Sequence, residues 1–96
     1  MNAIIQTLHD SLPSLKLKYP LVSLAVFGSY SRGEETPNSD LDIMYETLPN
    51  TFLHLHNYLS LQQELCNITN LKIDLVNKKY MNEVVLLTAE KDMVYV

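Results

Sequence analysis

The sequence has little of what marks a secreted or membrane-bound chain. Its 96 residues include a single cysteine, Cys66, which cannot form an internal disulfide. No apolar run approaches the length that a helix needs to span a bilayer. No basic-plus-apolar leader precedes the first predicted element. These features exclude an internal disulfide framework and predict a cytoplasmic location with no membrane contact.

Basic residues are also scarce. Lysine and arginine together number 7, against 11 aspartates and glutamates, which gives a formal net charge of -4. Because nucleic-acid binding requires a basic face, we do not expect direct contact with nucleic acid. Arg32 is the only arginine. With 47% hydrophobic residues, the chain suffices for one domain, residues 1–96, and is too short for a second, substrate-binding domain.

The chemistry is concentrated where an apolar run, Leu21–Phe27, ends at Gly28 and Ser29. This pattern predicts a strand that turns into a short helix over residues 29–34. Gly28 allows a ligand to come close to the backbone. Ser29 can cap the helix, whose free N–H groups and dipole favour phosphate oxygens. The turn is therefore a candidate phosphate site.

Two carboxylates follow at the next predicted strand. Polar and apolar residues alternate from Asp40 to Tyr45, which places Asp40 and Asp42 on one face of a half-buried strand. Neighbouring carboxylates repel each other unless a cation or a proton intervenes. Mg²⁺ prefers such oxygen ligands and completes its shell with water and substrate phosphates. For this strand to share a site with Gly28, the two strands should be antiparallel neighbours, and the chemistry suggested is metal-assisted transfer at phosphorus.

A third carboxylate lies on the strand predicted over residues 71–76. Its apolar residues alternate with Lys72 and Asp74, which share the other face. A helical crossover would lay this strand parallel to the Asp40–Tyr45 strand. Asp74 would then lie next to Asp40 and Asp42. A carboxylate in an apolar strand is unusual unless it is exposed or paired, so Asp74 completes the predicted set.

The remaining apolar spacing predicts helices that cover the sheet. A helix from Asn2 should be interrupted at Pro13, and a second short helix should end at Tyr19-Pro20. A helix over residues 51–66 has one apolar stripe, formed by Phe52, Leu55, Tyr58, Leu59 and Leu65. A last helix over residues 80–90 should pack on the sheet, followed by a short strand over residues 92–96. The expected class is α+β, with a small mixed sheet covered by helices.

Gly28-Ser29, ten intervening residues and Asp40-Leu41-Asp42 resemble the signature of the DNA polymerase beta nucleotidyltransferase superfamily. The likeness is greatest to its minimal nucleotidyltransferase (MNT) domains, the partners of HEPN toxins. The segment from Gly28 to Glu34 and the later Lys72-Ile73-Asp74-Leu75-Val76 are similar to theirs in type and order. The resemblance covers nearly the whole chain and implies the nucleotidyltransferase fold.

The resemblance also implies roles for individual residues. It assigns catalysis and metal binding to three aspartates, Asp40, Asp42 and Asp74, and nucleotide binding to Gly28, Ser29 and Arg32. The aspartates would hold one or two Mg²⁺ ions, and Asp74 would also act as general base toward the attacking hydroxyl.

The implied reaction transfers a nucleotide, AMP from ATP or another nucleoside triphosphate, to a tyrosine hydroxyl on a HEPN ribonuclease toxin. The chain would thereby act as an antitoxin. The alternative is a non-catalytic antitoxin that binds and occludes its partner. Antibiotic nucleotidylation is disfavoured, because the usual drug-binding domain is missing. The sequence permits a homo-oligomer and does not give the oligomeric state.

Overall fold

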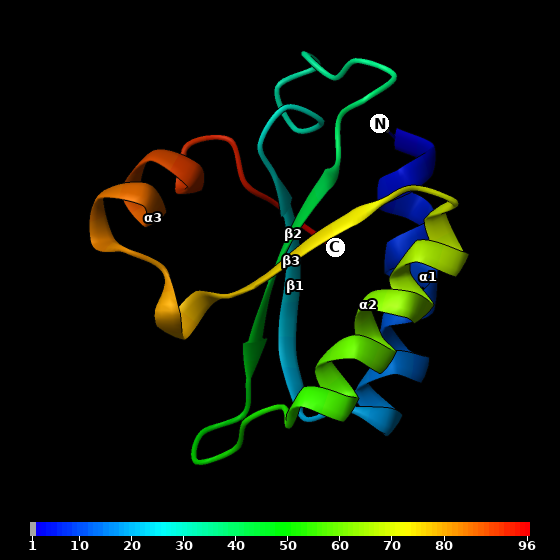
Figure 1. Ribbon diagram of the computed structural model, residues 1–96, viewed down its shortest axis with the longest axis vertical. Coiled ribbons are helices and arrows are strands. Elements are labelled where there is room, and N and C mark those ends of the chain that lie inside the picture. The colour runs from blue at the N-terminus through cyan, green and yellow to red at the C-terminus, as the bar shows by residue number, and fades with distance from the viewer. Residues whose placement is uncertain (1) are drawn as a thin grey trace.

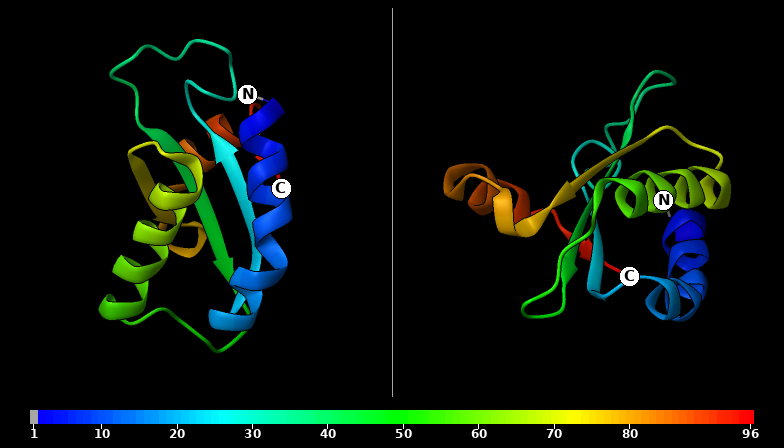
Figure 2. Two further views of the ribbon diagram at one scale, coloured as in Figure 1. Left: turned by 90° about the vertical axis from the view of Figure 1, so that its right-hand side faces the viewer. Right: turned by 60° about the horizontal axis from the view of Figure 1, so that its bottom comes forward.

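The computed structural model describes residues 2–96. Its elements, in chain order, are α1 (Asn2–Lys18), β1 (Leu21–Phe27), β2 (Leu41–Thr47), α2 (Leu55–Thr69), β3 (Ile73–Asn77), the 3-10 helix η1 (Lys78–Tyr80), α3 (Glu83–Glu90) and β4 (Val94–Tyr95). Helices α1 and α2 lie against one face of the sheet, and α3 lies on the other side (Figures 1 and 2). The α+β class with a small mixed sheet is confirmed.

The sheet contains four strands in the order β3-β2-β1-β4. Strands β1 and β2 are antiparallel, and β2 and β3 are parallel. The parallel pairing requires a long connection, which α2 supplies. The terminal strand β4 pairs antiparallel with β1. The predicted neighbours of the site strands and the short terminal strand are therefore confirmed.

The core lies between the sheet and the two long helices. Alternate residues of β1, β2 and β3 point toward α1 and α2, as the period of a strand requires. In this layer the side chains that are no more than 2% exposed are Leu8, Leu15, Leu24, Val26, Leu41, Ile43, Leu61, Leu65 and Leu75. This layer carries the apolar packing that holds the fold together.

Helix α1 continues through Pro13 and is not split there, contrary to expectation. A proline in a helix interior removes a backbone hydrogen bond and costs about 3 kcal/mol. Leu8 and Leu15 lie on either side of Pro13, and both are buried in the core. Burying a leucine stabilises the fold by about 1.5–3 kcal/mol, so packing keeps the helix continuous. The helix ends before Tyr19-Pro20, as predicted.

Helix α2 begins four residues later than predicted and ends three residues later. It ends at Asn70, whose positive φ of 59° caps the helix. Part of the predicted stripe is wrong, because Leu55 and Leu59 are exposed and the buried residues are Leu61 and Leu65. Two side chains of α2 also bond the edge of β3. The Tyr58 hydroxyl donates to the Leu75 carbonyl at 2.6 Å, and the Gln62 amide donates to the Ile73 carbonyl at 3.0 Å.

The C-terminal helix differs most from expectation. Residues 80–90 form the end of η1 and the short helix α3, and not one continuous helix. Asn82 starts α3, because its side chain accepts a hydrogen bond from the Val84 N–H at 2.9 Å. No residue of α3 is buried, so this helix does not pack on the sheet as predicted. None of the helices in residues 2–96 has the length and apolar character needed to cross a membrane.

Candidate active site

The turn after β1 brings the backbone against a carboxylate. Gly28 has a positive φ of 75°, a conformation that a side chain makes unfavourable. A Cβ atom added at Gly28 would lie 2.1 Å from Oδ2 of Asp42. The space that the sequence reserves at this glycine is therefore filled by the side chain of Asp42, which approaches the Gly28 backbone closely.

The segment after Gly28 forms turns and not the short helix predicted over residues 29–34. The Arg32 N–H donates to the Gly28 carbonyl at 3.3 Å, as in one helical turn. Gly33 then adopts a positive φ of 69°, which ends the turn, and the Glu34 N–H donates to the Ser29 carbonyl at 2.9 Å. One turn between two glycines is too short to make a helix.

This turn leaves backbone donors free. The N–H groups of Ser29, Tyr30 and Ser31 have no acceptor among residues 2–96. The Ser31 hydroxyl, and not that of Ser29, supports the turn by donating to the Gly28 carbonyl at 2.8 Å. Successive unpaired N–H groups form a concave donor site that suits phosphate oxygens. The free N–H groups predicted for this segment are therefore present without a helix.

The sheet places two of the three predicted carboxylates side by side. Asp42 pairs with Phe27 of β1 and with Asp74 of β3, on the face turned away from α1 and α2. Asp74 is exposed and Asp42 is half-buried. Asp40 comes just before β2 begins and is not part of the strand. The predicted proximity of Asp74 and Asp42 is therefore present in the fold, with Asp40 at its margin.

The carboxylates concentrate negative charge. The pKa of Asp42 is raised to about 6, chiefly by burial, then by a hydrogen bond that the carboxyls of Asp42 and Asp74 can share and by the charge of Asp74. The charge of Asp40 adds to this rise in pKa, and Arg32 opposes it. A cluster of this kind favours a bound cation or a retained proton.

The donors suit a hard cation, although they do not enclose one. No three His, Cys, Asp or Glu side chains in residues 2–96 converge closely enough to hold a metal ion. Asp42 and Asp74 nevertheless supply adjacent carboxylates on one face of the sheet. Since Mg²⁺ commonly takes only one or two protein carboxylates and fills its shell with water and phosphate, this donor set fits it.

Arg32 extends the site toward the C-terminal segment. Its Nε donates to Glu34 at 2.8 Å, and its Nη1 lies 3.9 Å from a carboxylate oxygen of Asp92. Arg32 and Gly28 line a hollow of about 310 Å³ together with residues of α3. The predicted nucleotide-binding residues Gly28 and Arg32 thus lie at one concave surface, with Ser29 next to them in the chain.

A second hollow adjoins the first. It has a volume of about 550 Å³, and its lining includes Asp74, Phe27, Tyr80 and Val85. Phe27 and Val85 line both hollows, and sequence reasoning missed them. The antiparallel pairing predicted for the two site strands could have identified Phe27, which lies opposite Asp42. No local pattern indicated Val85, because its position depends on where α3 lies.

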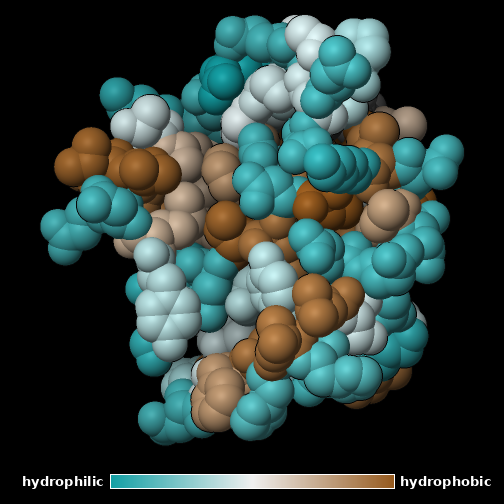
Figure 3. Space-filling view, viewed as in Figure 1, coloured by the Kyte–Doolittle hydropathy of each residue, from teal (hydrophilic) through white to brown (hydrophobic). Residues whose placement is uncertain are grey.

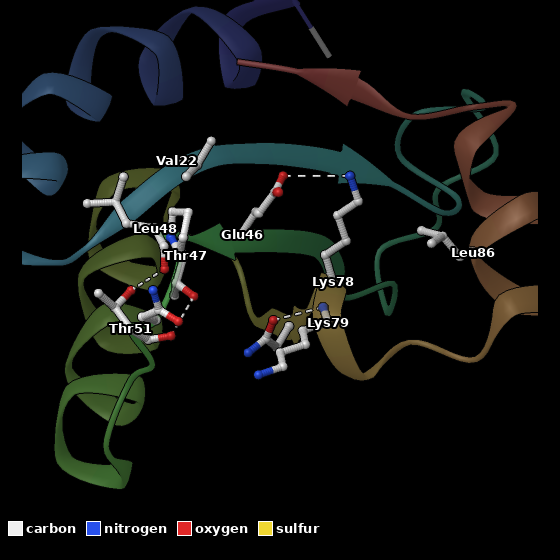
Figure 4. A pocket seen from close by; sticks show the side chains of 11 residues that line it. Val22, Glu46, Thr47, Leu48, Thr51, Lys78, Lys79 and Leu86 are labelled. Atoms are coloured by element: carbon white, nitrogen blue, oxygen red, sulfur yellow. Dashed lines mark hydrogen bonds and ion pairs between the residues drawn. The ribbon is translucent and has the colours of Figure 1, made fainter.

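A third hollow, of about 640 Å³ and so larger than the other two, lies at the other end of the strands (Figure 4). Its lining includes Val22 near the start of β1 and Glu46 near the end of β2. Glu46 lies 3.6 Å from the Lys78 Nζ (Figure 4). None of the predicted site residues lines this hollow, so its size alone does not make it the site.

The chain matches known proteins over nearly its whole length. The model of the nucleotidyltransferase domain family matches residues 9–96. A relative from Methanocaldococcus jannaschii, provisionally named a protein adenylyltransferase, is 41% identical over 97 residues, which span 100% of this chain and 97% of the relative. The protein adenylyltransferase MntA of Thermococcus cleftensis is 32% identical over 94 residues, 96% of this chain and 89% of MntA.

The chain is also similar in fold to a solved structure. The crystal structure of a toxin-antitoxin with AMP-PNP contains a chain that is 28% identical, with a TM-score of 0.68 over 98% of this chain and 69% of that chain. The family match and the likeness in fold agree with the resemblance seen in the Gly28-Ser29 turn and the aspartates. This chain belongs to the nucleotidyltransferase domain family, in the branch that contains the MntA protein adenylyltransferases.

Proposed function

We propose that this chain is an antitoxin that transfers AMP from ATP to a tyrosine hydroxyl of a HEPN-family toxin. One observation carries the proposal. Asp42 is held between Asp74 and the Gly28 backbone, next to a turn with free N–H donors. This arrangement places carboxylates and phosphate-binding groups at one surface. The relatives named protein adenylyltransferases, and the toxin-antitoxin structure with AMP-PNP, support the choice of nucleotide and of partner.

The turn would bind the triphosphate. The N–H groups of Ser29, Tyr30 and Ser31, which have no acceptor among residues 2–96, would donate to its oxygens. The absent side chain at Gly28 lets the Asp42 carboxylate lie against the turn that would bind the phosphates. The guanidinium of Arg32, on the wall of the adjoining hollow, adds a positive charge for the phosphates or the base. Together these groups would orient the α-phosphate toward the carboxylates.

The carboxylates would then serve the transfer itself. Asp42 and Asp74, with Asp40 beside them, would hold Mg²⁺. When bound, Mg²⁺ supplies charge neutralisation for the triphosphate and the carboxylates. Asp74 is the exposed member of the pair and can accept the proton of the incoming hydroxyl. The bond from the acceptor oxygen to the α-phosphorus forms as the bond to pyrophosphate breaks, and the proton passes from Asp74 to water.

The intact mass of the toxin tests this function. The product of the neighbouring gene, which the proposal takes to be a HEPN toxin, is incubated with the chain, ATP and Mg²⁺, and we expect its mass to increase by AMP units. The double variant Asp40→Asn, Asp42→Asn should add none. The matched control is Asp10→Asn, which makes the same change on an exposed part of α1 and should act as wild type.

The alternative function gives a different result. If the toxin is inhibited and forms a stable complex but gains no mass, the chain acts by occlusion and the transfer reaction is wrong. Inhibition that survives in the Asp40→Asn, Asp42→Asn variant leads to the same conclusion. The cytoplasmic location predicted from the single cysteine and the lack of a long apolar run remains part of the proposal, because both reactants would be produced there.

A further inference from the structure

Helix α3 is strongly apolar and yet unburied. Its sequence, EVVLLTAE, has apolar residues at five of its eight positions, and none of them is buried. Val84 is 72% exposed and Leu87 is 65% exposed. We name the surface formed by Tyr80, Val84, Val85 and Leu87 the α3 ridge. A helix that is apolar around most of its circumference is normally covered by protein, so the α3 ridge lacks a partner.

The α3 ridge is continuous with the reaction site. Val85 lines both hollows of the site, Tyr80 lines the hollow that contains Asp74, and Val84 lines the hollow that contains Arg32. In Figure 3 the apolar side chains of this region stand out at the left of the molecule, where Figure 1 places α3. A molecule that covers the α3 ridge therefore also reaches the edge of the carboxylate site.

We propose that the α3 ridge is the docking surface for the protein substrate, an inference that rests on the proposed function. A transferase of 96 residues must hold the macromolecule that carries its acceptor hydroxyl. The reaction brings that hydroxyl to Asp74, which shares a hollow with two residues of the α3 ridge, Tyr80 and Val85. The substrate should therefore have apolar side chains that cover the α3 ridge and basic residues near its acceptor hydroxyl.

Charge argues for a different protein and against a second copy of the chain. Each chain has a formal net charge of -4, and its site aspartates lie beside the α3 ridge. Two copies joined through their ridges would bring two acidic sites together, and like charges facing each other across an interface are unfavourable. A partner with basic residues near the acceptor hydroxyl complements the same surface.

A second exposed apolar cluster provides the comparison. It contains Leu55 and Leu59 in the first part of α2 and Phe52, which precedes the helix. Helix α2 lies on the side of the sheet opposite α3 (Figure 1). None of these three residues lines a hollow that contains a site aspartate. Leu55 is 73% exposed, so replacing it removes as much exposed apolar side chain as replacing Leu87. Leu55 is therefore the matched control for Leu87.

The test measures the affinity for the toxin at both surfaces. The same neighbouring gene product is titrated, without ATP, against wild type, Leu87→Asp and Leu55→Asp by isothermal calorimetry. We expect Leu87→Asp to weaken binding by about tenfold or more, because a charge would replace an apolar contact, and Leu55→Asp to bind within about twofold of wild type. Val84→Asp is a second ridge variant. Circular dichroism checks that each variant is folded.

Kinetics separate docking from chemistry. With ATP and Mg²⁺, Leu87→Asp should raise KM for the toxin and leave kcat at saturating toxin within about twofold, because the side chain contributes to binding and not to the reacting groups. A kcat that falls with an unchanged KM would overturn the docking role. Equal affinities of Leu87→Asp and wild type, or a loss confined to Leu55→Asp, would overturn it as well.

The remaining outcomes distinguish this inference from the proposed function. If wild type transfers AMP and Leu87→Asp keeps the wild-type KM, docking at the α3 ridge is wrong and the function stands. If wild type binds the toxin but transfers nothing, the function is wrong, and the calorimetry alone decides the docking. Sedimentation of the chain alone gives the last outcome: a dimer that Leu87→Asp dissociates would assign the α3 ridge to a second copy and overturn the proposal.

Discussion

The two faces of the sheet carry different side chains. Toward α1 and α2 the strands present leucine, isoleucine and valine, and Leu41, Ile43 and Leu75 are almost fully buried. On the opposite face lie Asp42 and Asp74, together with the buried Ala25 and Met44, beside a short helix with no buried residue. Each strand contributes to both faces, because successive side chains point to opposite sides. Alternate residues of the same strands therefore supply the main core and the candidate site.

This separation explains how so small a chain can tolerate an unfavourable site. A half-buried carboxylate whose pKa is raised destabilises the folded chain at neutral pH. The packed face opposes this cost through a core that contains no buried polar or charged residue among residues 2–96. The open face can then keep charges and apolar side chains that serve binding and not folding.

The comparison predicts that truncating a leucine destabilises the protein when the leucine lies in the core and not when it lies on the α3 ridge. Leu61→Ala, in the core, should lower the free energy of unfolding by about 2–5 kcal/mol, because it removes apolar contacts and leaves a cavity. Leu87→Ala, on the α3 ridge, should change it by no more than about 0.5 kcal/mol. Urea unfolding of the two variants and wild type measures both values. A large loss in Leu87→Ala would mean that α3 is part of the core.

The two glycines of the site turn give a second, smaller contrast. Gly28→Ala and Gly33→Ala both place a Cβ atom at a positive φ, which costs about 1–2 kcal/mol. Only at Gly28 does the new atom meet another group, since nothing lies within 4 Å of a Cβ at Gly33. Gly28→Ala should therefore also displace the Asp42 carboxylate and lower the rate of AMP transfer.

Initial rates of AMP transfer check this contrast. We expect Gly28→Ala to lose about tenfold or more in rate, because a displacement of about 1 Å at a reacting group can cost that much. Gly33→Ala should stay within a few-fold of wild type once both variants are shown to be folded. Equal losses of rate in the two variants would mean that backbone conformation matters and that the contact between Gly28 and Asp42 does not.

Much of this comparison was predictable from the sequence. Alternation placed Asp74 on the face opposite Ile73 and Leu75, and the parallel crossover then brought Asp74 beside Asp42. The antiparallel pairing of β1 and β2 followed from the need to join Gly28 to the aspartates. These features depend on short-range periodicity and on connection rules, which a single sequence carries.

The predictions that are wrong concern features that depend on tertiary contacts. Pro13 does not break α1, because leucines on either side of it are buried in the core. The apolar spacing of α3 looks like that of a packed helix, yet the helix covers no core. Periodicity tells which residues are apolar and not what covers them, so a surface for a partner and a surface for the core give the same pattern.

The smallest predicted effect compares two carboxylates on the two sides of the molecule. Burial raises the pKa of Asp42, whereas hydrogen bonds from Lys18 and from the Tyr19 hydroxyl lower the pKa of Glu64 below its ordinary value of 4.5. Glu64 lies on α2, and the Lys18 Nζ is 2.6 Å from its carboxylate, so the pair joins the end of α1 to α2. A group with a lowered pKa stabilises the folded chain above its unfolded pKa.

The contribution of Glu64 should therefore be complete at neutral pH and disappear as the pH falls from about 4.5 through the folded pKa. Because Lys18 is exposed and solvent screens its charge, the contribution of the pair is small. Thermal unfolding at several pH values should give a lower Tm for Glu64→Gln than for wild type at pH 7, and the gap should close in acid. Glu90→Gln, at an exposed position of α3, is the control and should follow wild type throughout. A gap between Glu64→Gln and wild type that does not change with pH would show that Glu64 stabilises the helices by packing and not by its charge.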